Sequence, residues 1–309
     1  MKISIRNITC VLVCATSSLV FAGNQSEFNL SGEVEAGLTH NSALSVDELD
    51  DVSNQSDNGH TLGGMLQGKW QINPKAQITS RYAYNQQRYN EYSQYDLDLH
   101  QFSLDSSYKF SQVELGLRFD GAKARLPAGT FLDFQQLSVY VGKFLQPETF
   151  LRGSLNLKNK AFTELTQRDA TGFNASADLF HFMNNAKTML LIGLSAEKES
   201  AEDNQFNYWG MGLNTKLTHK FDIFGLSSKV GLGWRYQYKD YDSVEVSEFQ
   251  ARYNLERDEI RQVIQANWEM FILNNLSIVT ELEHGNYKSK MENLSYQQNV
   301  ASLGLNYSF

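Results

Sequence analysis

The 309-residue sequence predicts an all-β fold, namely a transmembrane antiparallel up-and-down β-barrel of about 14 strands. Three observations lead to this prediction. Apolar and polar residues alternate with a period of two along most of the chain, and tight turns alternate with longer connections. No stretch after the N-terminal segment approaches the roughly 20 apolar residues of a transmembrane helix. A barrel wall needs apolar residues on one face only, so a hydrophobic content of 41% is compatible with a membrane barrel.

The first 22 residues have the pattern of a secretory signal peptide. Lys2 and Arg6 form a positive start, residues 8–20 are mostly apolar, and Ala22 ends a cleavage site of the kind that signal peptidase accepts. We expect residues 1–22 to be removed and residues 23–309 to form one barrel domain. Cys10 and Cys14 both lie in the signal, so the mature chain would form no disulfide.

The net charge argues against one class of partner. It is -8 for the whole chain and becomes -10 once Lys2 and Arg6 are removed. Nucleic acid is itself polyanionic, so this acidic balance excludes it as an expected partner.

Fourteen alternating segments follow the signal. Several are unambiguous: in one of them Val113, Leu115 and Leu117 share one face, and polar residues or glycine occupy the other. The weakest is the fourth, because Asp98 and His100 share a face with apolar residues. The expected strands are 28–40, 60–72, 76–90, 96–110, 112–123, 132–144, 149–162, 170–182, 187–199, 206–219, 226–241, 256–271, 276–288 and 296–309.

The connections alternate in length, as they do in transmembrane barrels with short periplasmic turns and longer external loops. Tight turns are expected at 73–75, 111, 146–148, 184–186, 222–225 and 274–275. Longer connections are expected at 41–59, 124–131, 163–169, 200–205, 242–255 and 289–295. An even number of strands closes without an exposed edge, which a membrane requires. A secreted soluble sandwich is the alternative, but it gives no reason for loop lengths to alternate.

The last strand ends the chain on an aromatic residue. Phe309, Tyr307 and Leu305 share its apolar face. This ending resembles the C-terminal insertion signal of bacterial outer-membrane barrels, which the barrel assembly machinery reads. The resemblance implies an integral protein in the outer membrane of a Gram-negative bacterium, in contact with membrane lipid and lipopolysaccharide.

The polar faces of the strands predict a lumen lined by charges of both signs. Such a lining forms either a hydrated pore or a network of salt bridges, and fourteen strands leave room for a modest channel. The candidate lumen-facing residues are Glu114, Arg118, Asp120, Arg152, Arg235, Glu269 and Glu281.

No constellation predicts catalysis or a cofactor, so no enzyme is expected. His40 and His60 flank the acidic connection 41–59 and form a possible metal site, although such a connection is more often simply solvated. Asp96, Asp98 and His100 alternate along one strand about 6.5 to 7 Å apart, too far to converge on one ion.

Three segments carry a family resemblance: residues 206–213 (FNYWGMGL), 234–241 (WRYQYKDY) and 296–305 (YQQNVASLGL). They resemble the barrel domain of surface lipoprotein assembly modifiers, which implies a fourteen-stranded barrel that helps to move lipoproteins to the cell surface. Those proteins also carry a tetratricopeptide domain, whose pattern this sequence does not show. The sequence therefore predicts a transport or export-associated channel, possible partners being a secreted or surface lipoprotein. The alternatives are a surface barrel that binds partners through its external loops, a passive porin, and a hydrolase at the barrel rim.

Overall fold

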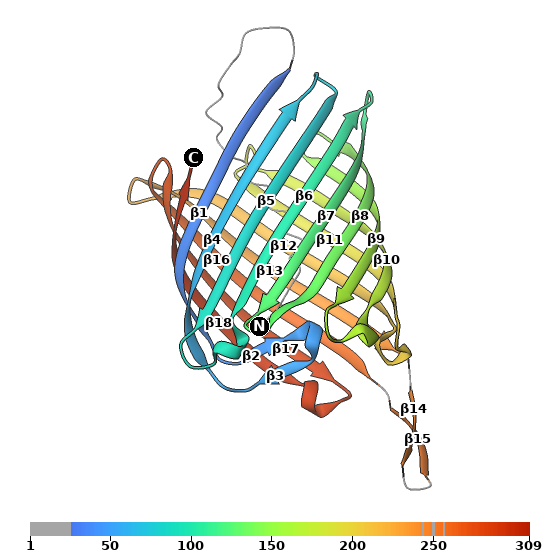
Figure 1. Cartoon of the computed structure of the whole chain (residues 1–309). Helices are drawn as coiled ribbons and strands as arrows, with labels where there is room; N and C mark the ends of the chain where they lie inside the picture. The colour runs from blue at the N-terminus through green and yellow to red at the C-terminus, as the bar shows by residue number, and fades with distance from the viewer. Residues whose placement is uncertain (1–25, 243, 249–250, 256) are drawn as a thin grey trace.

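The computed structural model describes residues 26–242, 244–248, 251–255 and 257–309. Fourteen long strands form a closed antiparallel barrel in which each strand pairs with the next and the last pairs with the first (Figure 1). This confirms the predicted fold class and rules out a two-sheet sandwich. The barrel strands are β1 (Glu27–Asn41), β4 (Asp57–Gln71), β5 (Ala76–Tyr89), β6 (Leu97–Lys109), β7 (Val113–Leu126), β8 (Gly129–Gln146), β9 (Thr149–Phe162), β10 (Ala170–Met183), β11 (Thr188–Ala201), β12 (Tyr208–Ile223), β13 (Leu226–Tyr241), β16 (Asp258–Leu273), β17 (Leu276–Ser289) and β18 (Tyr296–Ser308).

The two ends of the chain close the barrel. β1 pairs with β18 in a register that places Val34 opposite Tyr307 and Ala36 opposite Leu305. The Phe309 amide donates to the Gly32 carbonyl at 2.9 Å, and the Gly32 amide donates to the Phe309 carbonyl at 2.8 Å. Closure leaves no strand edge, so every wall strand finds its ladder partners within the barrel.

The outer face of the wall is apolar and exposed, because successive side chains of a strand point to opposite sides. Leu232 on β13, for example, is 55% exposed. The same holds for large apolar side chains on other strands, including Leu30, Leu66, Leu117, Leu155, Leu194, Ile264 and Leu303. A continuous exposed apolar belt of this kind needs a lipid environment. Within the described part of the chain, no helix has the length and apolar character needed to cross a membrane.

The two ends of the barrel differ in their connections, as expected. Tight turns lie at the end that carries the C-terminus, at the top of Figure 1. The other end carries the 3₁₀ turns η1 (Asp47–Leu49), η2 (Ser93–Tyr95), η3 (Thr166–Arg168), η4 (Asn204–Phe206) and η5 (Glu292–Leu294). It also carries two small hairpins, formed by β2 (Leu44–Val46) with β3 (Asp51–Ser53) and by β14 (Val244–Glu248) with β15 (Ala251–Leu255). We call it the long-loop end.

One predicted loop is wrong. Residues 124–131 were expected to form a longer connection, but β7 runs to Leu126 and β8 starts at Gly129, so only residues 127–128 join them. Gly129 has a φ of +133°, a conformation that favours glycine and permits this tight reversal. Ala124 and Leu132 pair across the two strands and are both buried, which extends the ladder beyond the predicted strand ends.

Candidate functional site: the first loop in the barrel mouth

Residues 42–56, here called the first loop, fold across the mouth of the barrel at the long-loop end (Figure 1). The β2–β3 hairpin pairs Leu44 with Ser53 and Val46 with Asp51. Four successive residues of the loop, Ala43 to Val46, are buried, and Leu44 is 0% exposed. The prediction of a solvated loop at residues 41–59 is therefore wrong, because a loop in solvent does not bury four residues in a row.

Apolar contacts hold the first loop on one side of the mouth. Leu44 and Val46 belong to a buried cluster whose other members come from the ends of β5 to β9 and from η2. On the opposite side, Ala43 packs against Val263 and the stacked rings of Tyr287 and Tyr296. The wall members of the first cluster are Tyr89, Tyr95, Leu97, Ala124, Leu132 and Phe162. The first loop covers these inward apolar residues.

Polar contacts to β18 fix the start of the first loop. The Gln298 side-chain amide donates to the Ala43 carbonyl at 2.6 Å, and the Ser42 amide donates to the Asn299 carbonyl at 2.9 Å. The Ser45 hydroxyl lies 3.0 Å from the Tyr296 hydroxyl. These bonds satisfy backbone and hydroxyl groups that the loop would otherwise bury without partners.

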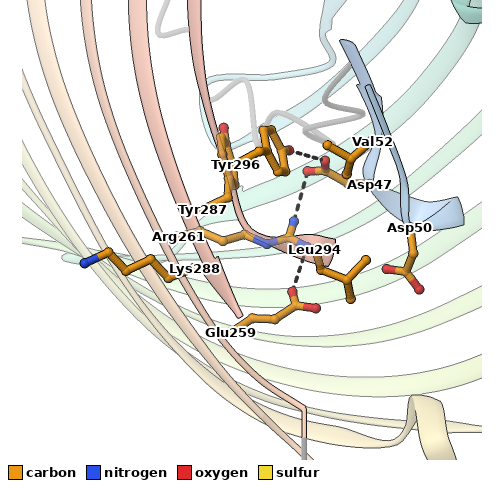
Figure 2. Close-up of a pocket in the computed structure, with 9 residues that line it drawn as sticks. All are labelled: Asp47, Asp50, Val52, Glu259, Arg261, Tyr287, Lys288, Leu294 and Tyr296. Carbon is orange, nitrogen blue, oxygen red and sulfur yellow. Dashed lines mark hydrogen bonds and ion pairs between the residues drawn. The ribbon is translucent and has the colours of Figure 1, made fainter. Parts of the chain in front are cut away.

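The turn η1 carries three acidic side chains toward a basic part of the wall. Asp47 accepts from Arg261 at 3.0 Å and from the Tyr296 hydroxyl at 2.8 Å. Figure 2 shows Arg261 lying between Asp47 and Glu259 of the wall. Asp50 ends the turn in the left-handed conformation, with a φ of 54°, which aspartate tolerates better than most residues.

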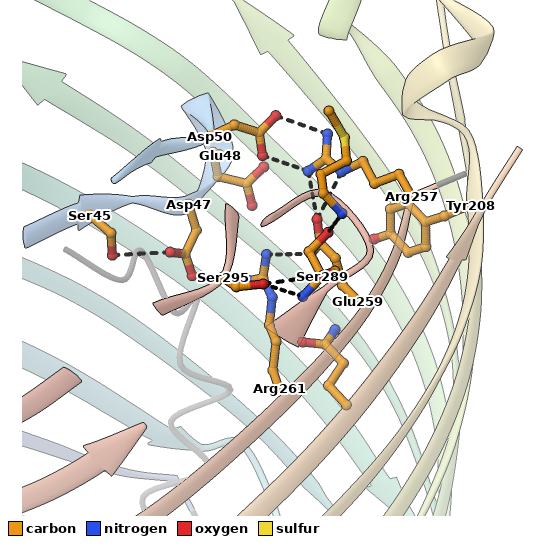
Figure 3. A network of polar contacts seen from close by, with 12 residues as sticks. Ser45, Asp47, Glu48, Asp50, Tyr208, Arg257, Glu259, Arg261, Ser289 and Ser295 are labelled. Atoms are coloured by element: carbon orange, nitrogen blue, oxygen red, sulfur yellow. Dashed lines mark hydrogen bonds and ion pairs between the residues drawn. The ribbon is translucent and has the colours of Figure 1, made fainter. Parts of the chain in front are cut away.

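Asp50 makes the most extensive ion pairs of the loop. Both its carboxylate oxygens accept hydrogen bonds from Arg257, at 2.5 and 2.9 Å (Figure 3). One of them also accepts a hydrogen bond from Arg168 at 2.6 Å. Glu48 pairs with Lys160 at 3.1 Å, and Arg168 also donates to the Glu48 carbonyl at 3.0 Å. Charge-assisted pairs with two parallel hydrogen bonds have fixed geometry as well as strength. They orient the loop on the wall.

The electrostatic setting of Glu48 favours its charged form. Burial raises the pKa of Glu48, but the cations Lys160, Lys239 and Arg261 outweigh burial and hold the pKa below its usual value of 4.5. The Glu48 carboxylate therefore stays ionised at neutral pH, as its ion pair requires.

The wall supplies its own acids and rings beneath the loop. Glu259 bridges Arg257 and Arg261 at 2.7 and 2.8 Å, and Glu199 pairs with Lys160 at 3.0 Å. Three cations lie over aromatic rings: Arg168 over Phe206 at 4.3 Å, Lys239 over Tyr208 at 4.1 Å, and Arg257 over Tyr241 at 4.4 Å from the ring centroid. These contacts hold the basic side chains in place.

The residues predicted to face the lumen are spread along the wall and do not form one cluster. Arg118 pairs with Asp120 at 2.6 Å, Arg152 with Asp178 at 3.3 Å, and Arg235 with Glu283 at 3.9 Å. Glu269 pairs with Lys229 and accepts from Ser277. Glu114 lies on β7, and Glu281 on β17 pairs in register with Ser302. All seven candidates alternate with the apolar side chains of the outer face.

The histidines considered for metal binding lie on the outer face. His40 contacts Asn58 at 2.9 Å, and His100 contacts the Tyr82 hydroxyl at 2.8 Å. Asp98 pairs with Arg88 at 2.7 Å. The loop aspartates instead meet arginines, and the described residues contain no group of three or more His, Cys, Asp or Glu side chains suited to a metal ion.

The basic residues that hold the first loop were mostly missed in the sequence. Arg168 and Arg257 lie in connections, and Lys160 lies at the end of β9. One sequence signal was available: the run Ala43-Leu44-Ser45-Val46 is mainly apolar within an otherwise polar connection. Such a run predicts burial and could have indicated that the loop folds inward.

Comparison with known proteins identifies the fold. No protein-family model and no curated protein sequence matches the chain. The outer-membrane channel DcaP of Acinetobacter baumannii is 11% identical with a TM-score of 0.54, and the match covers 94% of this chain and 99% of that one. OmpT of Vibrio cholerae is 8% identical with a TM-score of 0.53, and the match covers 94% of this chain and 100% of OmpT. CdiB of Acinetobacter baumannii is 10% identical with a TM-score of 0.49. That match covers 89% of this chain but only 60% of the length of CdiB. At these identities the likeness to DcaP and OmpT establishes the fold alone, and that fold is the bacterial outer-membrane β-barrel.

Proposed function

We propose that this protein is an outer-membrane channel for small hydrophilic solutes whose first loop narrows the external mouth. The observation that carries the proposal is the loop itself, folded into the mouth and held by ion pairs to Lys160, Arg168, Arg257 and Arg261. A barrel used only as a membrane anchor has no need of a loop bound at its mouth by four basic side chains.

The lumen supports passage of water and polar solutes. Glu35 on β1 and Asn85 on β5 face inward, on either side of Gly63, and both side chains are exposed. An exposed side chain on the inner face of a closed barrel indicates space that water can enter. Charges of both signs line the rest of the wall, which favours hydrophilic solutes over apolar ones.

The size of the mouth favours small solutes over proteins. The first loop lies across it, and moving a folded lipoprotein through would require the loop and its ion pairs to be displaced completely. DcaP, described as an outer membrane channel, has a similar fold over almost its whole length. The export of a lipoprotein, which the family resemblance implies, stays a prediction.

Planar lipid bilayers test the proposal. The purified, folded protein should conduct in discrete steps, and a variant that lacks residues 43–55 should give larger steps because the obstruction is gone. A barrel that shows the heat-modifiable gel mobility of folded barrels and yet gives no steps would contradict the channel proposal.

A second candidate function is partner binding at the cell surface. The β14–β15 hairpin extends beyond the barrel rim at the long-loop end, at the bottom of Figure 1. A projecting hairpin is accessible to another macromolecule. Removing residues 244–255 should leave conductance unchanged and abolish binding to a surface partner if this second candidate is correct.

A further inference from the structure

We propose that the barrel mouth contains a binding site for a solute with several carboxylate groups, and that the first loop occupies this site in the absence of the solute. The site, here called the basic pocket, comprises Lys160, Arg168, Lys239, Arg257 and Arg261. The inference deepens the proposed channel function and rests on it for its biological role.

The charge balance of the pocket depends on the first loop. Five basic and four acidic side chains line it, and three of the acids, Asp47, Glu48 and Asp50, belong to the loop. If the loop withdraws, the five bases keep Glu199 in the lining, and Glu197 and Glu259 on the wall beside it, as acidic neighbours. The vacated pocket would attract anions strongly.

The geometry of the contacts fits carboxylates. Arg257 holds Asp50 through two parallel hydrogen bonds, the arrangement in which a guanidinium recognises a carboxylate. Arg261 and Lys160 hold the carboxylates of Asp47 and Glu48 in the same turn. The loop thus presents three carboxylates within four residues, and a soluble ligand that replaces it needs several carboxylates close together. A single carboxylate cannot match contacts that the loop makes at three points.

Lys239 provides a second, independent observation. Its ammonium group lies 4.1 Å from the ring centroid of Tyr208 and 6.0 Å from that of Tyr241. The wall carboxylates that attract it, Glu197 and Glu199, form their ion pairs with Lys158 and Lys160. Lys239 therefore shares its anions with other cations, and a ligand with one more carboxylate than the loop supplies could form an ion pair with it.

The rigidity of the pocket supports binding. Arg168, Arg257 and Lys239 lie over the rings of Phe206, Tyr241 and Tyr208. Cations that are held in place before a ligand arrives lose less side-chain freedom on binding than flexible surface lysines.

Titration of citrate into the folded protein in detergent, followed by calorimetry, tests the site. Citrate has three carboxylates and serves as the probe. Replacing two loop acids, Asp47→Asn with Asp50→Asn, should tighten citrate binding by at least about fivefold, because the internal competitor is weakened. Replacing two pocket bases, Arg257→Gln with Arg261→Gln, should abolish saturable binding. Acetate at three times the citrate concentration should not compete.

Two further variants keep the test decisive if the arginine variant folds poorly. Lys239→Gln removes a cation without leaving a carboxylate of the described residues unpaired, and it should still weaken citrate binding. Arg152→Gln, at a wall arginine outside the pocket, should leave citrate binding unchanged.

Opposite responses of the acid and base variants distinguish competition from structural damage, which would weaken binding in both. Citrate binding that is unchanged or weaker in the Asp47/Asp50 variant, with heat-modifiable barrels in all samples, would overturn the proposal. The measurement needs no conduction, so a failed channel experiment and a failed binding experiment remain separate results.

Discussion

Leu44→Ala tests how the first loop stays in the mouth. Leu44 lies on β2, is fully buried, and contacts the inward apolar side chains at the ends of β5 to β9. The substitution removes apolar packing from the docked loop and leaves every ladder hydrogen bond of the wall unchanged. We therefore expect the loop to loosen while the barrel stays folded.

The free-energy cost of Leu44→Ala for docking of the loop follows from the complete burial of the Leu44 side chain. The substitution removes three carbon atoms from water-free surroundings, about 2.4 kcal/mol at about 0.8 kcal/mol per methylene, and the cavity left behind raises the total to about 3 kcal/mol. Because each 1.4 kcal/mol is about a tenfold change in an equilibrium, the ratio of undocked to docked loop should rise by roughly 150-fold.

Single-channel recording in planar bilayers measures this ratio as the frequency and duration of high-conductance openings. Leu232→Ala is the matched control, because it is the same change on the lipid-facing side of β13, where the side chain is exposed. Heat-modifiable mobility on gels should be normal for both variants. Traces of Leu44→Ala that match those of the unmodified protein would refute the conclusion that apolar packing holds the loop.

Further predictions concern the wall, the C-terminus and pH. Leu232→Arg, on the lipid face, should cost roughly 2 to 4 kcal/mol in a urea unfolding titration, whereas Arg235→Leu should cost less; equal costs would mean that the faces are assigned wrongly. Phe309→Asp should leave signal cleavage intact and reduce insertion, which membrane fractionation would show; normal assembly would disprove the insertion signal. The pKa of Glu48 lies below 4.5, so the ion pair of Glu48 contributes fully to docking of the loop above pH 4.5. This contribution is lost as the pH falls through the lowered pKa of Glu48. Openings should therefore become more frequent below pH 4.5, and Lys160→Gln should diminish this dependence; a pH response that is the same in that variant would contradict the role of the pair.

The sequence alone determined the wall of this protein. Successive side chains of a strand point to opposite faces. In a membrane barrel, apolar residues that face lipid therefore alternate with polar residues that face the lumen along every strand. For this reason the alternation predicts fourteen segments and places Leu232 and Arg235 on opposite faces. The alternation does not stop where a turn is expected, which explains why β7 and β8 continue past the predicted ends at residues 123 and 132.

The tertiary structure alone decided what fills the mouth. The first loop has no periodic pattern, and its partners Lys160, Arg168 and Arg257 stand 112, 118 and 207 residues away from the acids they bind. Only closure of the barrel brings these side chains together, because it places β9, η3 and the start of β16 around one opening. A local pattern can show which way a wall residue faces, but it carries no information about which distant charges will meet across a lumen.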